Sequence, residues 1–87
     1  MSLSEDFEAA QASVKTLSQM PSNDELLKLY ALFKQGTVGD VSGKRPGMLD
    51  MKGRAKFDAW SKQKGTAKDD AMQGYVGLVD QLKKKLG

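Results

Sequence analysis

Four lysines stand out because no acidic side chain lies at the spacing that pairs charges on a helix. Asp and Glu are absent three and four residues away, in either direction, from Lys15, Lys34, Lys52 and Lys56. A helical basic residue often has such a partner. The sequence supplies Asp24 and Glu25 for Lys28, Asp50 for Arg54, Asp58 for Lys62, and Asp80 for Lys83 and Lys84. Lys52 and Lys56 are also four residues apart, which places like charges on one helix face. A bound anion would offset that repulsion, although an exposed basic face also tolerates it and Lys68 fails the same test.

Aromatic side chains accompany these cations. Tyr30, Phe33 and Lys34 are spaced i, i+3 and i+4, so two rings and an ammonium group share one helical face. This combination suits a ligand with phosphates and a planar base, because bases stack on rings and ammonium groups bind phosphate oxygens. The same spacing is typical of core residues, and Tyr75 is open to both interpretations.

The composition argues against most enzymatic mechanisms. The chain has no His and no Cys, so the usual general base, the commonest metal ligand and the thiol nucleophile are all missing. Residues 39–44 are one residue too short for a phosphate-binding loop, and Arg45 follows in place of Ser or Thr. Ser61 and Lys64 match the spacing of a serine–lysine acyl-enzyme pair, but the accompanying motifs are absent. We therefore expect no catalytic residue, no metal and no cofactor.

The length and the charge distribution predict one small domain with an anionic partner. Its 87 residues allow a single domain over residues 1–87. The net charge of +3 combines −4 over residues 1–27, +7 over residues 28–68 and 0 over residues 69–87, so the basic middle is suited to an anion. The longest apolar run has five residues, 29–33, where a membrane helix needs about 20. Acidic residues near the start do not fit a secretory signal, and we expect a cytoplasmic protein without stable membrane insertion.

Helical spacing of apolar residues predicts an all-α fold of four helices. The first is expected over about residues 4–17 and the third over about residues 51–62, with Ala55, Ala59 and Trp60 directed inward. Ser22 and Glu25 form a capping box that opens the second helix, which ends near Gly36. Thr66 is expected to open the fourth helix, whose apolar stripe is Met72, Tyr75, Val76, Val79, Leu82 and Leu86. Gly74 and Gly77 interrupt that helix, and close approach of a neighbouring helix would explain them.

The middle of the chain resembles the acyl-CoA-binding protein family. The resemblance is carried by YALFKQGTVGD at residues 30–40, RPGMLD at 45–50 and KGRAKFDAW at 52–60, and it continues through KGT at 64–66 to Ala71, Met72 and Tyr75. It implies an up-down-down-up bundle of four helices with a long loop between the second and third. It also implies a carrier and pool former that binds medium- and long-chain fatty acyl-CoA esters with high affinity and does not transform them.

The same resemblance assigns the site residues. The family's head-group positions fall on Lys15, Tyr30, Phe33, Lys34, Lys52, Lys56 and Tyr75. It implies that Tyr30 and Lys56 meet the 3′-phosphate of the CoA ribose, with Lys34 also on phosphate oxygens. The adenine is expected among the aromatics of the second helix and Lys15. Phe33 and Phe57 depart from the family, where tyrosine and tryptophan are common, so a hydroxyl contact at Phe33 is lost.

The acyl chain is expected in a groove formed by Leu26, Leu27, Ala31, Met48 and Leu49. We expect a monomer whose partner is the acyl-CoA ester, with transient contact to membranes or to enzymes that use acyl-CoA. Two other functions stay open at this point. A small basic helical nucleic-acid-binding protein would also use the basic middle and its aromatics, and a CoA-dependent hydrolase or transferase would have to use Ser61 and Lys64.

Overall fold

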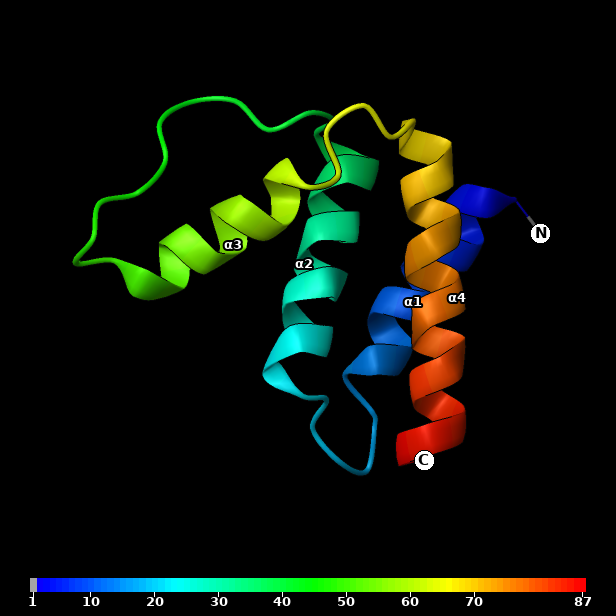
Figure 1. Ribbon diagram of the computed structural model, residues 1–87. Helices are drawn as coiled ribbons and strands as arrows, with labels where there is room; N and C mark the ends of the chain where they lie inside the picture. Colours follow the sequence, from blue (N-terminus) through cyan, green and yellow to red (C-terminus); the bar gives the residue numbers. More distant parts are fainter. Residues whose placement is uncertain (1) are drawn as a thin grey trace.

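A computed structural model describes residues 2–87 and places four helices in them. These are α1 (Leu3–Val14), α2 (Asn23–Thr37), α3 (Met51–Ser61) and α4 (Lys68–Leu86). Residues 2–87 contain no strand, so the all-α prediction is confirmed. In Figure 1, α1 and α4 run in one direction and α2 and α3 in the other, which is the up-down-down-up order.

The helix starts follow local capping chemistry. Ser22 Oγ accepts a hydrogen bond from the Glu25 backbone N–H at 3.2 Å, and the Glu25 carboxylate accepts one from the Ser22 N–H at 2.8 Å. This confirms the predicted capping box and fixes the first turn of α2. Helix α1 is shorter than expected, because it ends at Val14 and Lys15 is its C-cap.

The start of α4 was predicted one residue too early. Ala67 is the N-cap and makes no side-chain capping bond, while the Thr66 hydroxyl lies 3.5 Å from Gln63 Oε1. The Thr66 carbonyl also accepts a hydrogen bond from the Gln35 amide at 2.8 Å. Thr66 therefore belongs to the α3–α4 connection, which its carbonyl joins to α2, and Ala67 takes the cap position.

The core lies between α1, α2 and α4. Helix α4 packs on both α1 and α2, whereas α3 packs on α2 alone. The largest core side chains are Phe7, Leu29, Leu32, Tyr75, Val79 and Leu82. No residue of α3 is fully buried, so its predicted inward residues Ala55, Ala59 and Trp60 are only half-buried.

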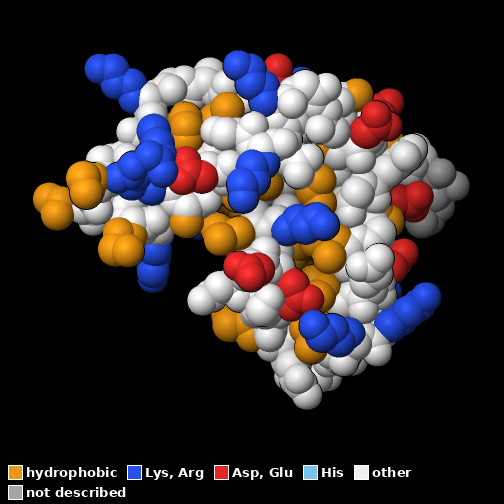
Figure 2. Space-filling view, viewed as in Figure 1, with side chains coloured by type: hydrophobic (Ala, Val, Ile, Leu, Met, Phe, Trp, Pro, Cys, Tyr) orange, Lys and Arg blue, Asp and Glu red, His pale blue; other side chains and the backbone are white. Residues whose placement is uncertain are grey.

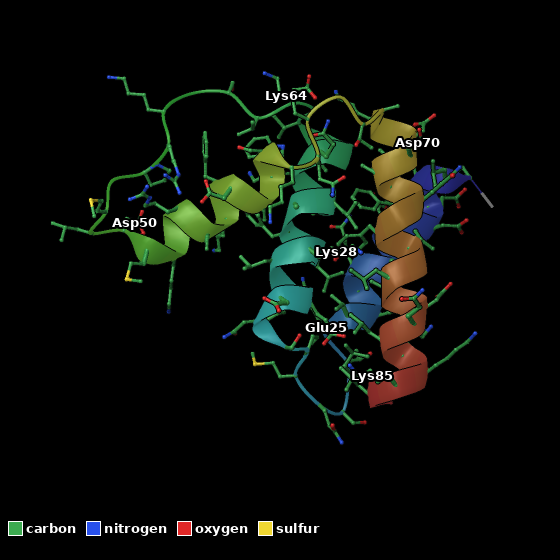
Figure 3. The ribbon with its side chains drawn as sticks, viewed as in Figure 1. Glu25, Lys28, Asp50, Lys64, Asp70 and Lys85 are labelled. Atoms are coloured by element: carbon green, nitrogen blue, oxygen red, sulfur yellow. The ribbon has the colours of Figure 1, made fainter. Side chains whose placement is uncertain are left out.

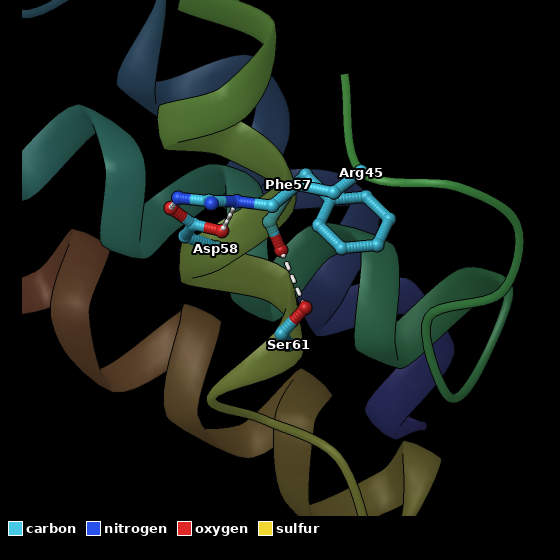
Figure 4. A network of polar contacts seen from close by, with 4 residues as sticks. All are labelled: Arg45, Phe57, Asp58 and Ser61. Carbon is cyan, nitrogen blue, oxygen red and sulfur yellow. Dashed lines mark hydrogen bonds and ion pairs between the residues drawn. The ribbon is translucent and has the colours of Figure 1, made fainter. Parts of the chain in front are cut away.

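Polar contacts attach the 38–50 loop and α3 to the bundle. The buried Gln35 amide donates to Asp40 Oδ1 at 2.8 Å, and the Gly65 N–H donates to the same oxygen at 2.9 Å. Trp60 Nε1 donates to the Gly39 carbonyl at 2.8 Å. Arg45 makes a two-point contact with Asp58 of α3, and Figure 4 shows this pair beside the hydrogen bond from Ser61 to the Phe57 carbonyl.

None of the helices in residues 2–87 has the length and apolar character needed to cross a bilayer.

Candidate functional site

A first cavity of about 480 Å³ opens between the end of α1, the 15–22 connection and α2. We call it the Lys15 pocket, and it is lined by Val14, Lys15, Leu17, Gln19, Met20, Pro21, Leu26, Leu29, Tyr30, Phe33 and Tyr75. Its wall is mostly apolar and aromatic, with Lys15 and Gln19 as its polar side chains. A flat ring system with a charged substituent fits such a wall, because the rings offer stacking faces and Lys15 offers an ammonium group.

A second cavity of about 400 Å³ lies between α2 and the first half of α3. We call it the Lys52 pocket, and its lining is Asn23, Leu26, Leu27, Tyr30, Met51, Lys52, Ala55 and Lys56. The apolar side chains come from both helices, and the two lysines belong to α3. Hydrocarbon and anionic groups can therefore be bound in one place, the former by leucine and methionine and the latter by the ammonium groups.

Tyr30 joins the two cavities. It lines both the Lys15 pocket and the Lys52 pocket, as does Leu26. The Lys56 Nζ lies 5.3 Å from the Tyr30 ring centroid, and the Lys34 Nζ lies 5.9 Å from the same centroid. Lys34 is also held 5.7 Å from the Trp60 ring centroid. Two ammonium groups from different helices thus converge on one tyrosine, which forms a site for a multiply charged anion.

Phe33 and Tyr75 belong to the core and to the site at once. The Tyr75 ring meets the Phe7 ring edge-on at 5.1 Å between centroids, and the Phe33 and Phe7 centroids are 6.0 Å apart. Both Phe33 and Tyr75 also line the Lys15 pocket. Burial raises the pKa of the Tyr75 hydroxyl, so it stays protonated at neutral pH. The two interpretations of these aromatics are compatible, because the wall of the pocket is also the edge of the core.

The predicted acyl-groove residues do not all meet. Leu26 and Leu27 line the Lys52 pocket. Ala31 is buried and lines a third cavity of about 610 Å³, the Lys62 pocket, which is formed by Asp24, Leu27, Lys28, Ala31, Ala55, Asp58, Ala59, Lys62 and Gln63. Leu27 and Ala55 are common to the Lys52 and Lys62 pockets. Met48 and Leu49 are exposed and line none of the cavities described for residues 2–87.

The local rule for charge partners chose the wrong partners. Asp58 was expected beside Lys62, but it binds Arg45, whose Nε and Nη2 donate at 2.8 and 2.6 Å. Glu25 was expected beside Lys28, but its carboxylate lies 3.2 Å from the Lys85 Nζ, and Figure 3 shows this pair at one end of the bundle.

These are the two ion pairs found in residues 2–87. Arg45 lowers the pKa of Asp58 by its hydrogen bonds, and the Ser22 N–H and then Lys85 lower that of Glu25. The lysines predicted to be unpaired are indeed outside both pairs, but so are Lys28 and Lys62, so the rule does not separate the two groups.

Several lining residues were not identified from the sequence. Val14, Leu17, Met20 and Leu29 belong to the Lys15 pocket, and Met51 and Ala55 belong to the Lys52 pocket. Met51 and Ala55 are four residues apart and therefore share one face of α3, but that spacing does not by itself show that the face lines a pocket. Within residues 2–87 no three acidic side chains converge where they could hold a metal ion.

Comparison with known proteins agrees with this geometry. The family model described as "Acyl CoA binding protein" matches residues 4–79. The chain is 63% identical over 81 residues to acyl-CoA-binding protein homolog 1 from Caenorhabditis elegans. The matched region covers 93% of this chain and 94% of the relative. It is 50% identical over 88 residues to an acyl-CoA-binding protein homolog from Manduca sexta, and the matched region covers 100% of this chain and 98% of the relative.

Solved structures of similar proteins have the same fold. The crystal structure of acyl-CoA-binding protein 2 from Oryza sativa superposes with a TM-score of 0.92 at 43% identity, covering 97% of this chain and 93% of that one. The crystal structure of the acyl-CoA-binding protein from Moniliophthora perniciosa gives a TM-score of 0.90 at 42% identity, covering 99% of this chain and 84% of that one. The match therefore extends over the sequence, the fold and the helices that form both pockets, and this chain belongs to the acyl-CoA-binding protein family.

Proposed function

We propose that this chain binds medium- and long-chain fatty acyl-CoA esters and acts as their carrier, without changing them chemically. The observation that carries the proposal is the position of Tyr30, which joins an aromatic pocket to a second pocket of leucine and methionine while Lys34 and Lys56 approach its ring. An acyl-CoA ester likewise has a planar base, a group of phosphates and, beyond the pantetheine arm, a hydrocarbon chain.

The head group is assigned to the first of these pockets and its rim. In this proposal the adenine lies in the Lys15 pocket against Tyr30 and Phe33, with Tyr75 behind them. The roughly four negative charges of CoA are met by ammonium groups through charge-assisted hydrogen bonds, from Lys15, Lys34, Lys52 and Lys56. The 3′-phosphate is assigned to Tyr30 and Lys56, as the family resemblance implies, and the Lys56 Nζ lies 5.3 Å from the Tyr30 ring centroid.

The acyl chain is assigned to the Lys52 pocket. Leu26 and Leu27 face it from α2, and Met51 and Ala55 face it from α3. Each methylene removed from water contributes about 0.8 kcal/mol when it is fully buried. Burial, and therefore affinity, should increase with the length of the acyl chain until the pocket is filled.

Isothermal titration calorimetry with free CoA and with a series of acyl-CoA esters tests this function. We expect the affinity to rise from free CoA through medium-chain to long-chain esters. Equal affinity for free CoA and palmitoyl-CoA would show that the acyl chain does not contact the Lys52 pocket. A mobility-shift assay with single-stranded and duplex DNA at moderate salt serves as the control for a general attraction of polyanions.

The absence of catalysis is part of the same proposal. Incubation of the protein with an acyl-CoA ester should release no free thiol, because the chain has no His or Cys to activate a nucleophile. Thiol release that is lost on changing Ser61 to Ala would contradict this. Cytoplasmic location and a monomeric state stay predictions, which cell fractionation and analytical ultracentrifugation test.

A further inference from the structure

Three of the four methionines in residues 2–87 have their side chains largely in solvent. Met20 is 81% exposed, Met48 is 80% exposed and Met51 is 78% exposed. Met72 is different, because it packs against the core. Figure 2 shows hydrophobic side chains projecting from the outer end of α3, and Figure 3 shows sulfur atoms there beside the labelled Asp50. An exposed thioether is open to oxidants in solution, whereas a packed one is shielded.

The exposed methionines differ in their relation to the ligand site. Met51 lines the Lys52 pocket together with Leu26 and Leu27. Met20 lines the Lys15 pocket, and Met48 lines none of the cavities described for residues 2–87. Met48 and Met51 lie three residues apart, at the end of the 38–50 loop and the start of α3, and their exposed fractions are almost equal. The two therefore differ mainly in whether a pocket includes them.

We propose that Met51 is an oxidation site for peroxides, and that its sulfoxide weakens binding of the acyl chain. A lone pair of the thioether sulfur attacks one oxygen of hydrogen peroxide, so that an S–O bond forms while the O–O bond breaks. The proton on the transferred oxygen passes to the leaving hydroxide, which departs as water. Sulfur loses two electrons and the peroxide gains them. The product is methionine sulfoxide, which methionine sulfoxide reductases convert back to the thioether.

The sulfoxide changes the character of the pocket wall. Leu26, Leu27 and Ala55 present only hydrocarbon to the Lys52 pocket, and the thioether of Met51 extends this apolar surface. A sulfoxide oxygen in the same place is a polar acceptor, and covering it with hydrocarbon removes its water. An acyl chain in the pocket must then dehydrate that oxygen or leave part of the wall uncovered. Either outcome weakens binding of esters that carry a chain.

The position of Met51 makes the effect depend on the ligand. Free CoA has no hydrocarbon chain, so its affinity should not depend on the oxidation state of Met51. Met20 would act differently, because the Lys15 pocket is assigned to the head group that free CoA and its esters share. Since Met51 is largely exposed at the first turn of α3, its oxidation should leave the fold intact. The inference rests on the proposed function and adds a chemical control of the same site.

Two variants that each keep one methionine at this end of α3 test the inference. Both carry Met20→Leu, which removes the oxidisable side chain of the Lys15 pocket. The first adds Met48→Leu and keeps Met51, and the second adds Met51→Leu and keeps Met48. Leucine is apolar, has nearly the volume of methionine and has no sulfur to oxidise. Each protein is treated with hydrogen peroxide, peptide mass spectrometry measures the sulfoxide at each methionine, and circular dichroism checks the fold. Calorimetry with free CoA and with palmitoyl-CoA then compares the treated and untreated proteins.

Oxidation of the variant that keeps Met51 should raise its Kd for palmitoyl-CoA at least about fivefold and its Kd for free CoA less than about twofold. Treatment with methionine sulfoxide reductases should restore the first value. The variant that keeps Met48 should change less than about twofold with either ligand. Palmitoyl-CoA, added before the peroxide, should slow oxidation of Met51 and not of Met48.

The results that would overturn the inference are separate from those that would overturn the carrier function. An unchanged Kd for palmitoyl-CoA after complete oxidation of Met51, or equal changes in the two variants, defeats the inference alone. Equal loss of affinity for free CoA and palmitoyl-CoA would also defeat it, because the effect would then lie outside the acyl pocket. If the untreated proteins bind palmitoyl-CoA no better than free CoA, the assignment of the acyl chain fails and the inference fails with it.

Discussion

Replacing Lys56 by Ala removes one ammonium group from the proposed phosphate site and little else. The Lys56 Nζ lies 5.3 Å from the Tyr30 ring centroid, and the side chain lines the Lys52 pocket. Lys56 is exposed and takes part in neither of the ion pairs found in residues 2–87. The substitution therefore leaves no buried partner without a hydrogen bond, and the free energy of unfolding should change little.

The expected loss of affinity follows from the kind of bond. A hydrogen bond to a charged group contributes about 1.5 to 3 kcal/mol. Because Lys56 is exposed and screened by water, the lower end applies, and about 1.5 kcal/mol corresponds to a Kd roughly tenfold higher. Removing one phosphate contact should also reduce the salt dependence of binding. The free energy of unfolding, measured in urea, should stay within about 0.5 kcal/mol of the unaltered value.

Lys62→Ala is the matched control for calorimetry with a long-chain acyl-CoA ester. It makes the same change in net charge, but Lys62 lines the Lys62 pocket and is absent from the two pockets that share Tyr30. Its Kd should change less than about twofold, as expected for a screened surface charge. Equal losses for the two variants would show that only the overall field matters. An unchanged Kd for Lys56→Ala would show that the phosphates bind elsewhere.

Three further outcomes concern stability. Gly77→Ala should stabilise α4 by about 1 kcal/mol, because nothing lies within 4 Å of the added Cβ. Gly74→Ala should stabilise it less, because its Cβ would lie 3.3 Å from Leu32 Cδ2. Urea unfolding of the two variants measures the difference. Gln35→Leu should cost about 1 to 3 kcal/mol in the same assay, because the buried Gln35 amide holds the Asp40 carboxylate and the α3–α4 connection. The Gly65 N–H and then Gln35 lower the pKa of Asp40 in the folded state, so this contribution to stability is present above the ordinary carboxyl pKa and is lost as pH falls through the lowered one. Thermal melts should show a smaller loss of stability on acidification for Asp40→Asn than for the unaltered protein.

Features set by local spacing could be predicted from the sequence. The Ser22–Glu25 capping box needs only a three-residue interval, and the structure has it. The placing of Tyr30 and Lys34 on one helical face follows from the helical period, and the 5.9 Å distance from the Lys34 Nζ to the Tyr30 centroid agrees with it. Gly74 also fits, since Leu32 approaches it closely.

Features set by contacts between distant segments could not be predicted by the same rules. Arg45 and Asp58 are 13 residues apart, and Glu25 and Lys85 are 60 residues apart, so no local interval reveals either pair. The cation that pairs with an acid depends on which distant segments of the chain meet in the folded structure. Gly77 shows the converse, because open space surrounds it and helix packing does not explain it.

The way α3 is held determines how the proposed groove behaves. Helix α3 buries no residue and packs on α2 alone, so polar bonds, including those from Trp60 to Gly39 and from Arg45 to Asp58, do much to fix its position. Yet α3 supplies half of the Lys52 pocket. A ligand between α2 and α3 adds contacts to α3, the helix with the fewest buried contacts. A ligand concentration of 100 times the Kd stabilises the folded state by about 2.7 kcal/mol. Because hydrocarbon chains of different length fill different lengths of the groove, a helix with few buried contacts adjusts to them at less cost than a core helix would.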